Sequence, residues 1–132
     1  MIPLTRLASY NGTPVSQHLT DVAMDQVAAS TMIGGAILTK LLGTSAWYAP
    51  GASVAYLVDS IVNDQKRMIP CSVLLEGEYQ QEDLCIGVPC IIGKNGLESI
   101  VDVQLNSQEQ DKFNQSAAAV KKTNEALKVV LK

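Results

Sequence analysis

The 132-residue sequence has few of the residues that build metal and nucleophile sites. Its three cysteines, Cys71, Cys85 and Cys90, include no C-x-x-C pair, and an odd count argues against a disulfide scaffold or a zinc site. Each lies in an apolar, strand-like run, so we expect three buried thiols without a catalytic role. His18 is the only histidine, which excludes a multi-histidine zinc site, and its polar neighbours predict an exposed loop residue.

Several signatures of catalytic and nucleotide-binding loops are also absent. The sequence contains no G-x-S-x-G, no P-loop and no G-x-G-x-x-G after a predicted strand. Glu76-Gly77-Glu78 offers two carboxylates near a strand end, and at this spacing they would project from the same side of the strand. A metal or acid/base site is a possible role for this pair, but two carboxylates exposed to solvent at the end of a strand are the favoured interpretation. The residues alone therefore predict a domain without a self-contained active site.

Charge and long apolar runs are equally sparse. Ten basic and thirteen acidic residues give a formal net charge of -3 and a pI near 5.0, which argues against a nucleic-acid partner. No stretch approaches the ~20 uninterrupted apolar residues of a membrane span, and Met1 is followed directly by Ile2-Pro3 rather than by a signal peptide. With 47% apolar residues the chain is not disordered, and its length predicts one domain.

The first half of the chain predicts a loop and two helices. Residues 1–19 contain helix breakers and read as a loop, and Thr20 or Asp21 can cap a helix over Val22–Leu42. Gly34-Gly35 interrupt that helix at a cost of about 1 kcal/mol each, so we expect close backbone packing or a kink there. A single apolar stripe predicts a second helix over Ala52–Asp64.

The second half predicts three strands and a final helix. Strand-like runs cover Arg67–Glu76, Leu84–Gly93 and Leu97–Leu105, and Asn95-Gly96 between the last two indicates a hairpin. Pro89 indicates an edge strand or a bulge. Ser107 and Gln110 form a candidate capping box before a helix whose apolar stripe is Phe113, Ala117, Val120, Leu127 and Leu131. This order of elements predicts an α+β fold with an antiparallel meander.

Five segments follow one another in the order typical of a known family: Met1–Arg6, Ser45–Ser53, Arg67–Val73, Leu75–Tyr79 and Asp83–Pro89. Together they resemble the C-terminal half of bacterial malate dehydrogenases of the lactate-dehydrogenase-like type, and the match covers essentially the whole chain. The resemblance implies a lactate/malate dehydrogenase C-terminal-like fold, with long helices packed on the three-stranded meander between Arg67 and Leu105 and a C-terminal helix.

The resemblance also implies that the chemistry lies elsewhere. In this family a Gly-His-Gly-Asp segment, whose histidine is the general acid/base, directly precedes the Met-x-Pro-Leu-x-Arg motif that begins here at Met1. Residues 1–132 would then be the substrate domain, with the NAD-binding Rossmann domain and the catalytic histidine and aspartate upstream. His18 does not match the catalytic position. The resemblance implies that none of these residues is catalytic or binds a metal ion. It also implies that residues 1–132 alone are inactive.

One segment is implied to face the substrate. Ser45 and Ala46 would form part of the pocket wall, and the small side chain of Ala46 would leave room for the second carboxylate of oxaloacetate. Lactate dehydrogenases tend to carry threonine there. Pro50 would lie near the nicotinamide ring of NAD, where an apolar contact helps to exclude water. The alternative is an ordinary interhelical loop with a buried Trp47.

The implied whole protein oxidises malate to oxaloacetate in the citric acid cycle with NAD, in the cytoplasm, as a homodimer or homotetramer without nucleic acid or membrane partners. The family's basic residue before the glycine pair and its acidic residue after it are missing around Gly34-Gly35, which could mark a subunit interface. Two alternatives stay open at this point. One is a lactate or other 2-hydroxy-acid dehydrogenase domain, and the other is a free-standing interaction module with this fold.

Overall fold

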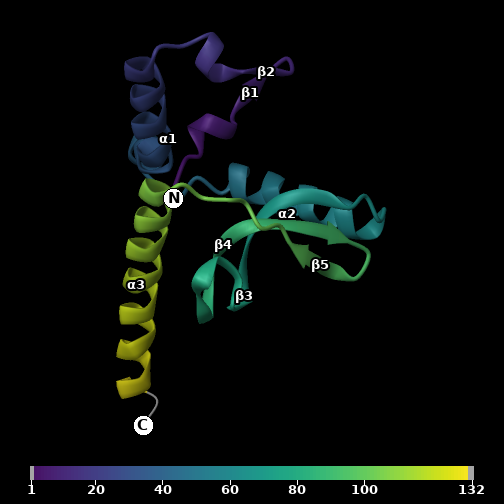
Figure 1. Ribbon diagram of the computed structural model, residues 1–132. Helices are drawn as coiled ribbons and strands as arrows, with labels where there is room; N and C mark the ends of the chain where they lie inside the picture. Colours follow the sequence, from purple (N-terminus) through teal and green to yellow (C-terminus); the bar gives the residue numbers. More distant parts are fainter. Residues whose placement is uncertain (1, 131–132) are drawn as a thin grey trace. The chain divides into compact units, whose positions relative to one another are not determined.

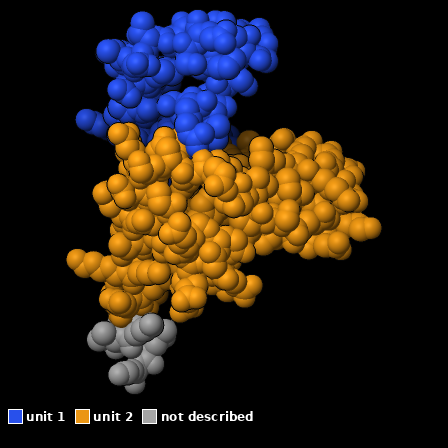
Figure 2. Space-filling view, in the orientation of Figure 1, with its two compact units in different colours: residues 1–48 blue, residues 49–132 orange. Residues whose placement is uncertain are grey.

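The computed structural model describes residues 2–130, and their side chains as far as residue 127 (Figure 1). The predicted stripe residue Leu131 lies outside this part. The chain divides into two compact units, residues 1–48 and 49–132 (Figure 2). The single domain expected from the length of the chain stays a prediction.

The first unit begins with structure where the sequence predicted only a loop. Two 3-10 turns, Thr5–Leu7 and Val15–Gln17, flank a small antiparallel hairpin of β1 (Ser9–Tyr10) and β2 (Thr13–Pro14). The hairpin turn is Asn11-Gly12, with φ values of 49° and 78°. Two successive positive φ angles match a type I′ turn, which Asn-Gly favours. The prediction was therefore wrong here, because the strands are too short to produce an alternating pattern.

The long helix α1 spans Asp21–Leu42 and agrees with the prediction to within one residue. The Thr20 hydroxyl accepts a hydrogen bond from the Ala23 amide at 3.3 Å, so Thr20 is the N-cap. Gly43 ends the helix with φ 68° and donates its N–H to the Thr39 carbonyl at 3.1 Å. Helices commonly end with a glycine in the left-handed backbone conformation, whose N–H donates a hydrogen bond to a carbonyl of the last turn.

Apolar side chains of α1 are exposed on more than one face of the helix. Eight large ones are each more than two-fifths exposed: Val22, Val27, Met32, Ile33, Ile37, Leu38, Leu41 and Leu42. By length and composition α1 could even cross a membrane, which the lack of a long uninterrupted apolar run did not predict. Core helices of soluble proteins can have the same length and apolar composition. An apolar helix with no other element packed on it indicates a further contact surface.

The helix α2 spans Tyr48–Val62, with all but its first residue in the second unit, and begins four residues earlier than predicted. The sequence Tyr48-Ala49-Pro50-Gly51 was expected to be a loop, but proline is tolerated in the first turn, where its missing N–H has no helical partner. The wholly buried Ser60 joins this helix to the sheet, since its hydroxyl donates to the Ile92 carbonyl at 2.7 Å.

Arg67 makes a second link between α2 and the sheet. Its guanidinium pairs with Asp59 at 2.9 Å and donates to the Tyr56 carbonyl at 3.3 Å. The same group lies 4.1 Å from the centre of the Tyr56 ring. Arg67, at the start of the first strand of the three-stranded sheet, thus holds α2 by an ion pair, a hydrogen bond and a cation–π contact.

The sheet is the predicted antiparallel meander, in the order β3-β4-β5. Its strands are β3 (Arg67–Glu76), β4 (Glu82–Gly93) and β5 (Gly96–Ile100) (Figure 1). The third strand is shorter than the predicted Leu97–Leu105, because the chain leaves the ladder after Ile100. Beyond that point Val101 still donates its N–H to the Pro89 carbonyl at 2.8 Å.

Pro89 lies in the central strand, so the expectation of an edge position is wrong, and the bulge falls two residues later, between Ile91 and Ile92. Pro89 pairs with Pro70 across β3 and β4. Neither proline has an N–H, so this must be a non-hydrogen-bonded pair, whose backbone groups point away from each other. Pro89 is tolerated because the β5 ladder begins only at Cys90.

Strict alternation in β4 puts one face of the sheet into the core. The buried side chains are Leu75 of β3, Leu84, Ile86, Val88, Cys90 and Ile92 of β4, and Phe113 and Ala117 of the last helix. The prediction of three buried cysteines holds only for Cys90. Cys71 is half-buried and Cys85 is exposed, because Cys85 lies between two inward residues and must point outward.

The last helix, α3, spans Ser107–Val130. Its capping box lies one residue earlier than predicted. The Asn106 side chain accepts from the Glu109 amide and the Glu109 carboxylate accepts from the Asn106 amide, both at 2.9 Å. Phe113 and Ala117 of the predicted stripe are buried, whereas Leu127 is 55% exposed. Only the first part of α3 therefore packs on the core.

Tyr79 ties the β3–β4 connection to the segment before α3. Its hydroxyl donates to the Val101 carbonyl and accepts the Val103 N–H at 3.0 Å, and its ring lies 5.3 Å from that of Phe113. Burial is the main cause that raises the pKa of Tyr79. The residue has φ 52°, in the sparsely populated left-handed region, so these contacts hold a strained backbone in place.

Replacing Tyr79 by Phe should lower the free energy of unfolding by about 1–2 kcal/mol, since two backbone groups lose a partner while the ring contact remains. Urea denaturation followed by circular dichroism measures the change. Tyr10→Phe is the control, because Tyr10 is 66% exposed and its hydroxyl should contribute little. Equal stability of the two variants would contradict a structural role for the Tyr79 hydroxyl.

Candidate functional site

The predicted pocket residues lie on one short stretch that joins α1 to α2. Ser45 is exposed and its carbonyl accepts the Trp47 N–H at 3.1 Å, while Ala46 is half-buried. Pro50 is exposed in the first turn of α2. Ser45 and Ala46 belong to the first unit and Pro50 to the second. Their roles toward a substrate or cofactor stay predictions.

Two aromatic residues in this stretch were not predicted to be functional. Trp47 is 60% exposed and Tyr48 is 82% exposed, with their ring centres 6.5 Å apart. The alternative of a loop built around a buried tryptophan is therefore wrong. Large exposed aromatic groups beside small residues are typical of a contact surface. The sequence does draw attention to Trp47, because it is the only tryptophan. The sequence does not decide whether its side chain is buried in the core or exposed on a contact surface.

The other candidates do not form a reactive cluster. Among residues 2–130 no group of three histidine, cysteine or acidic side chains could hold a metal ion. His18 is exposed, and the centre of its ring lies 6.2 Å from the centre of the Tyr10 ring in an edge-to-face arrangement. The Glu78 carboxylate accepts the Glu76 N–H at 2.7 Å, and this hydrogen bond is the main cause that lowers the pKa of Glu78. Glu78 thus caps the end of β3, as expected for a solvated strand end.

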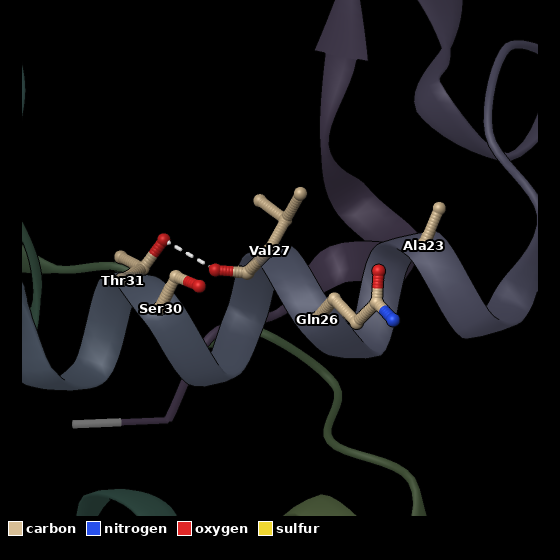
Figure 3. A pocket seen from close by; sticks show the side chains of 5 residues that line it. All are labelled: Ala23, Gln26, Val27, Ser30 and Thr31. Atoms are coloured by element: carbon tan, nitrogen blue, oxygen red, sulfur yellow. Dashed lines mark hydrogen bonds between the residues drawn. The ribbon is translucent and has the colours of Figure 1, made fainter.

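A shallow hollow lies along one face of α1 (Figure 3). Its lining residues are spaced three and four apart and come from this helix alone: Ala23, Gln26, Val27, Ser30 and Thr31. The Thr31 hydroxyl donates to the Val27 carbonyl at 2.8 Å, so it is already used within the helix. No titratable side chain lines the hollow, which therefore has the chemistry of a packing surface rather than of an active site.

These features define an α+β domain that has an exposed aromatic segment and, among residues 2–130, no group of side chains that could hold a metal ion. Residues 3–129 match the family model for the lactate/malate dehydrogenase, alpha/beta C-terminal domain, and the chain belongs to this family. The α+β fold expected from the sequence, with its meander and C-terminal helix, is confirmed.

Three malate dehydrogenases are similar to this chain. It is 70% identical to malate dehydrogenase of Flavobacterium johnsoniae over 131 residues, covering 99% of the chain and 42% of that protein. It is 65% identical to malate dehydrogenase of Bacteroides fragilis, covering 98% and 42%. The solved malate dehydrogenase of Salinibacter ruber superposes with a TM-score of 0.94 at 36% identity, covering 98% and 42%. The chain thus spans about two-fifths of the length of these relatives.

Proposed function

We propose that these residues are the substrate-binding part of an NAD-dependent malate dehydrogenase, which oxidises malate reversibly to oxaloacetate in the citric acid cycle. The observation that carries the proposal is the 70% identity over 131 residues to a malate dehydrogenase. Supporting it, the described residues contain a contact segment with small side chains but no reactive cluster. This is the division of labour expected of one half of a two-domain dehydrogenase.

The described residues do not by themselves fit NAD. None of the strands is followed by a glycine-rich turn into a helix, which is how a dinucleotide-binding unit holds the pyrophosphate. Pro50 offers one exposed apolar contact and nothing that holds a phosphate. We therefore place the nucleotide cradle, and the group that moves the proton, in the part of the full-length protein that corresponds to the remainder of its relatives.

Ala46 is the residue we assign to substrate choice. It is half-buried and its side chain is only a methyl group, which in this proposal leaves room for the second carboxylate of the substrate. Ser45 forms the adjoining part of the same pocket wall, and Pro50 lies toward the nicotinamide. In this proposal the chain contributes shape and the exclusion of water, and the bound cofactor supplies the redox chemistry.

Replacing Ala46 by Thr in the full-length protein should lower kcat/KM for oxaloacetate relative to pyruvate by about 10–200-fold, as expected when a close-fitting pocket loses the space of one small group. Steady-state assays with each 2-oxo acid and NADH measure the ratio. Ala55→Thr, an identical change at an exposed position of α2, is the control and should leave the ratio unchanged. An unchanged ratio in the Ala46 variant would refute the pocket assignment, and no activity in the unmodified full-length protein would refute the function.

We further propose that the full-length protein works in the cytoplasm as a homodimer or homotetramer. Supporting self-association, the eight large apolar side chains of α1 are exposed and lack a cover within their unit. Sedimentation of the full-length protein tests the assembly, because a monomer at all concentrations would exclude it.

A further inference from the structure

Two Asn-Gly dipeptides, Asn11-Gly12 and Asn95-Gly96, lie at the turns of two different antiparallel hairpins. An asparagine in this dipeptide loses its side-chain amide readily, because the glycine has no Cβ to hinder its own backbone nitrogen. The reaction needs that nitrogen to be free and the asparagine backbone to rotate. A firmly held turn therefore protects its asparagine, and a turn that opens easily does not.

The hairpin of β1 and β2 is weakly held (Figure 1). Its ladder has two residue pairs, and one of them includes Pro14, which has no N–H, so only Tyr10 and Thr13 can exchange both backbone hydrogen bonds. No residue of β1 or β2 is buried. Next to the ladder, the Val15 N–H donates to the Ala8 carbonyl at 2.9 Å. Opening this hairpin therefore breaks few contacts.

Asn11 and Gly12 are exposed at the tip of this hairpin, with φ values of 49° and 78°. Gly12 lies within the two-residue loop and not at a paired position, so the ladder does not use its N–H. Exposed loop tips of this kind are also where a chain opens most easily. Asn11 thus has both a free glycine nitrogen beside it and a backbone that can rotate.

The turn at Asn95 is held much more firmly. The β4–β5 ladder has four residue pairs and ends with Gly93 opposite Gly96, so the second glycine belongs to the ladder. Gly93 is buried, and a Cβ added there would lie 2.8 Å from a carboxylate oxygen of Asp64. The same carboxylate accepts the Lys94 N–H at 3.0 Å. Opening this turn would therefore disrupt a packed end of the sheet.

We propose that Asn11 is a site of spontaneous deamidation in this protein and that the fold protects Asn95. The Gly12 nitrogen bonds to the side-chain carbonyl carbon of Asn11, and the carbon–nitrogen bond of the side-chain amide breaks. The leaving nitrogen takes the proton from Gly12 and departs as ammonia. Water then opens the cyclic imide at one of its two carbonyl carbons. Attack at the side-chain carbon gives aspartate, and attack at the main-chain carbon gives isoaspartate.

The product differs from the original turn in charge and in backbone length. Each event makes the chain one unit more negative than its formal net charge of -3. Isoaspartate also routes the main chain through the side-chain carbon, and the two-residue loop between Tyr10 and Thr13 has no room for an extra backbone atom. We therefore expect isoaspartate at position 11 to break the hairpin, so that the modification is not reversed by refolding.

The test follows both asparagines in the full-length protein at mildly alkaline pH. Mass spectrometry of tryptic peptides registers each replacement of an amide by a carboxylate, and electron-transfer fragmentation distinguishes isoaspartate from aspartate. Asn11 should react at least about tenfold faster than Asn95, a ratio that needs a difference of only about 1.4 kcal/mol in the free energy of opening. In guanidinium chloride both hairpins are unfolded and the two rates should converge.

A variant tests the cause of the protection. Asp64→Gly removes the carboxylate that holds the Lys94 N–H, and glycine tolerates the φ of 48° at that position. It should accelerate the reaction of Asn95 and leave that of Asn11 unchanged. A rate at Asn11 no faster than that at Asn95 in the folded protein, or a ratio that persists in guanidinium chloride, overturns the proposal. No acceleration in Asp64→Gly overturns the assigned protection of Asn95, and none of these outcomes bears on catalysis.

Discussion

The purified 132-residue chain should show no detectable oxidation of malate with NAD⁺, and its affinity for NAD should not be tighter than millimolar. The physical reason is the content of the described residues. Their single histidine, His18, is exposed in a connector, and they contain neither a nucleotide cradle nor a cluster of three metal-binding or acid/base side chains. A hydride transfer needs a bound cofactor and a placed proton acceptor, and these residues supply neither.

Absorbance at the NADH band and calorimetric titration with NAD⁺ measure the two quantities. The full-length protein is the positive control and should turn over under the same conditions. Turnover that scales with the amount of purified chain and disappears in His18→Gln would contradict the division of labour proposed here. Such a result would place the proton acceptor inside the described residues.

Replacing Leu75 by Ala should lower the free energy of unfolding by about 2–5 kcal/mol, a large part of the total stability of a domain of this size. Leu75 is 0% exposed and lies near the end of β3, directly opposite the buried Leu84. Removing its side chain leaves a cavity that the neighbouring strand cannot close without losing its own register. Urea denaturation followed by circular dichroism measures the loss.

The neighbouring residue provides a matched control. Leu74 belongs to the same strand but points to the other face of the sheet and is 52% exposed. Leu74→Ala should therefore cost less than about 1 kcal/mol. Equal losses for the two variants would show that the buried face of the sheet is not the core of the second unit.

The regular elements were predictable where several turns or alternations repeat. The helix over residues 21–42 and the strand over 67–76 agree with prediction to within one residue, because each is a long segment of residues that favour one type of element. The hairpin at Asn11-Gly12 was missed, since two-residue strands leave no period to detect. The start of α2 was also missed, because Pro50 and Gly51 look like a loop although proline fits the first turn of a helix.

The candidate site was less predictable than the fold. The segment containing Ser45 and Ala46 could be located from its resemblance to a family, but its exposure could not. Trp47 would have been buried in a self-sufficient domain, whereas it is 60% exposed here. Composition gives the hydrophobicity of a residue, and only the packing of the chain decides whether this chain or another surface covers it.

By itself the sequence determined the class of the fold and the order of its three helices and of the strands of the meander. Those properties follow from local periodicity and from which residue types are present at all. The tertiary structure alone decided that Cys90 is buried while Cys85 is exposed, and that Tyr79 holds the segment before α3. These depend on contacts between residues distant in sequence, and such contacts leave no periodic pattern in the chain.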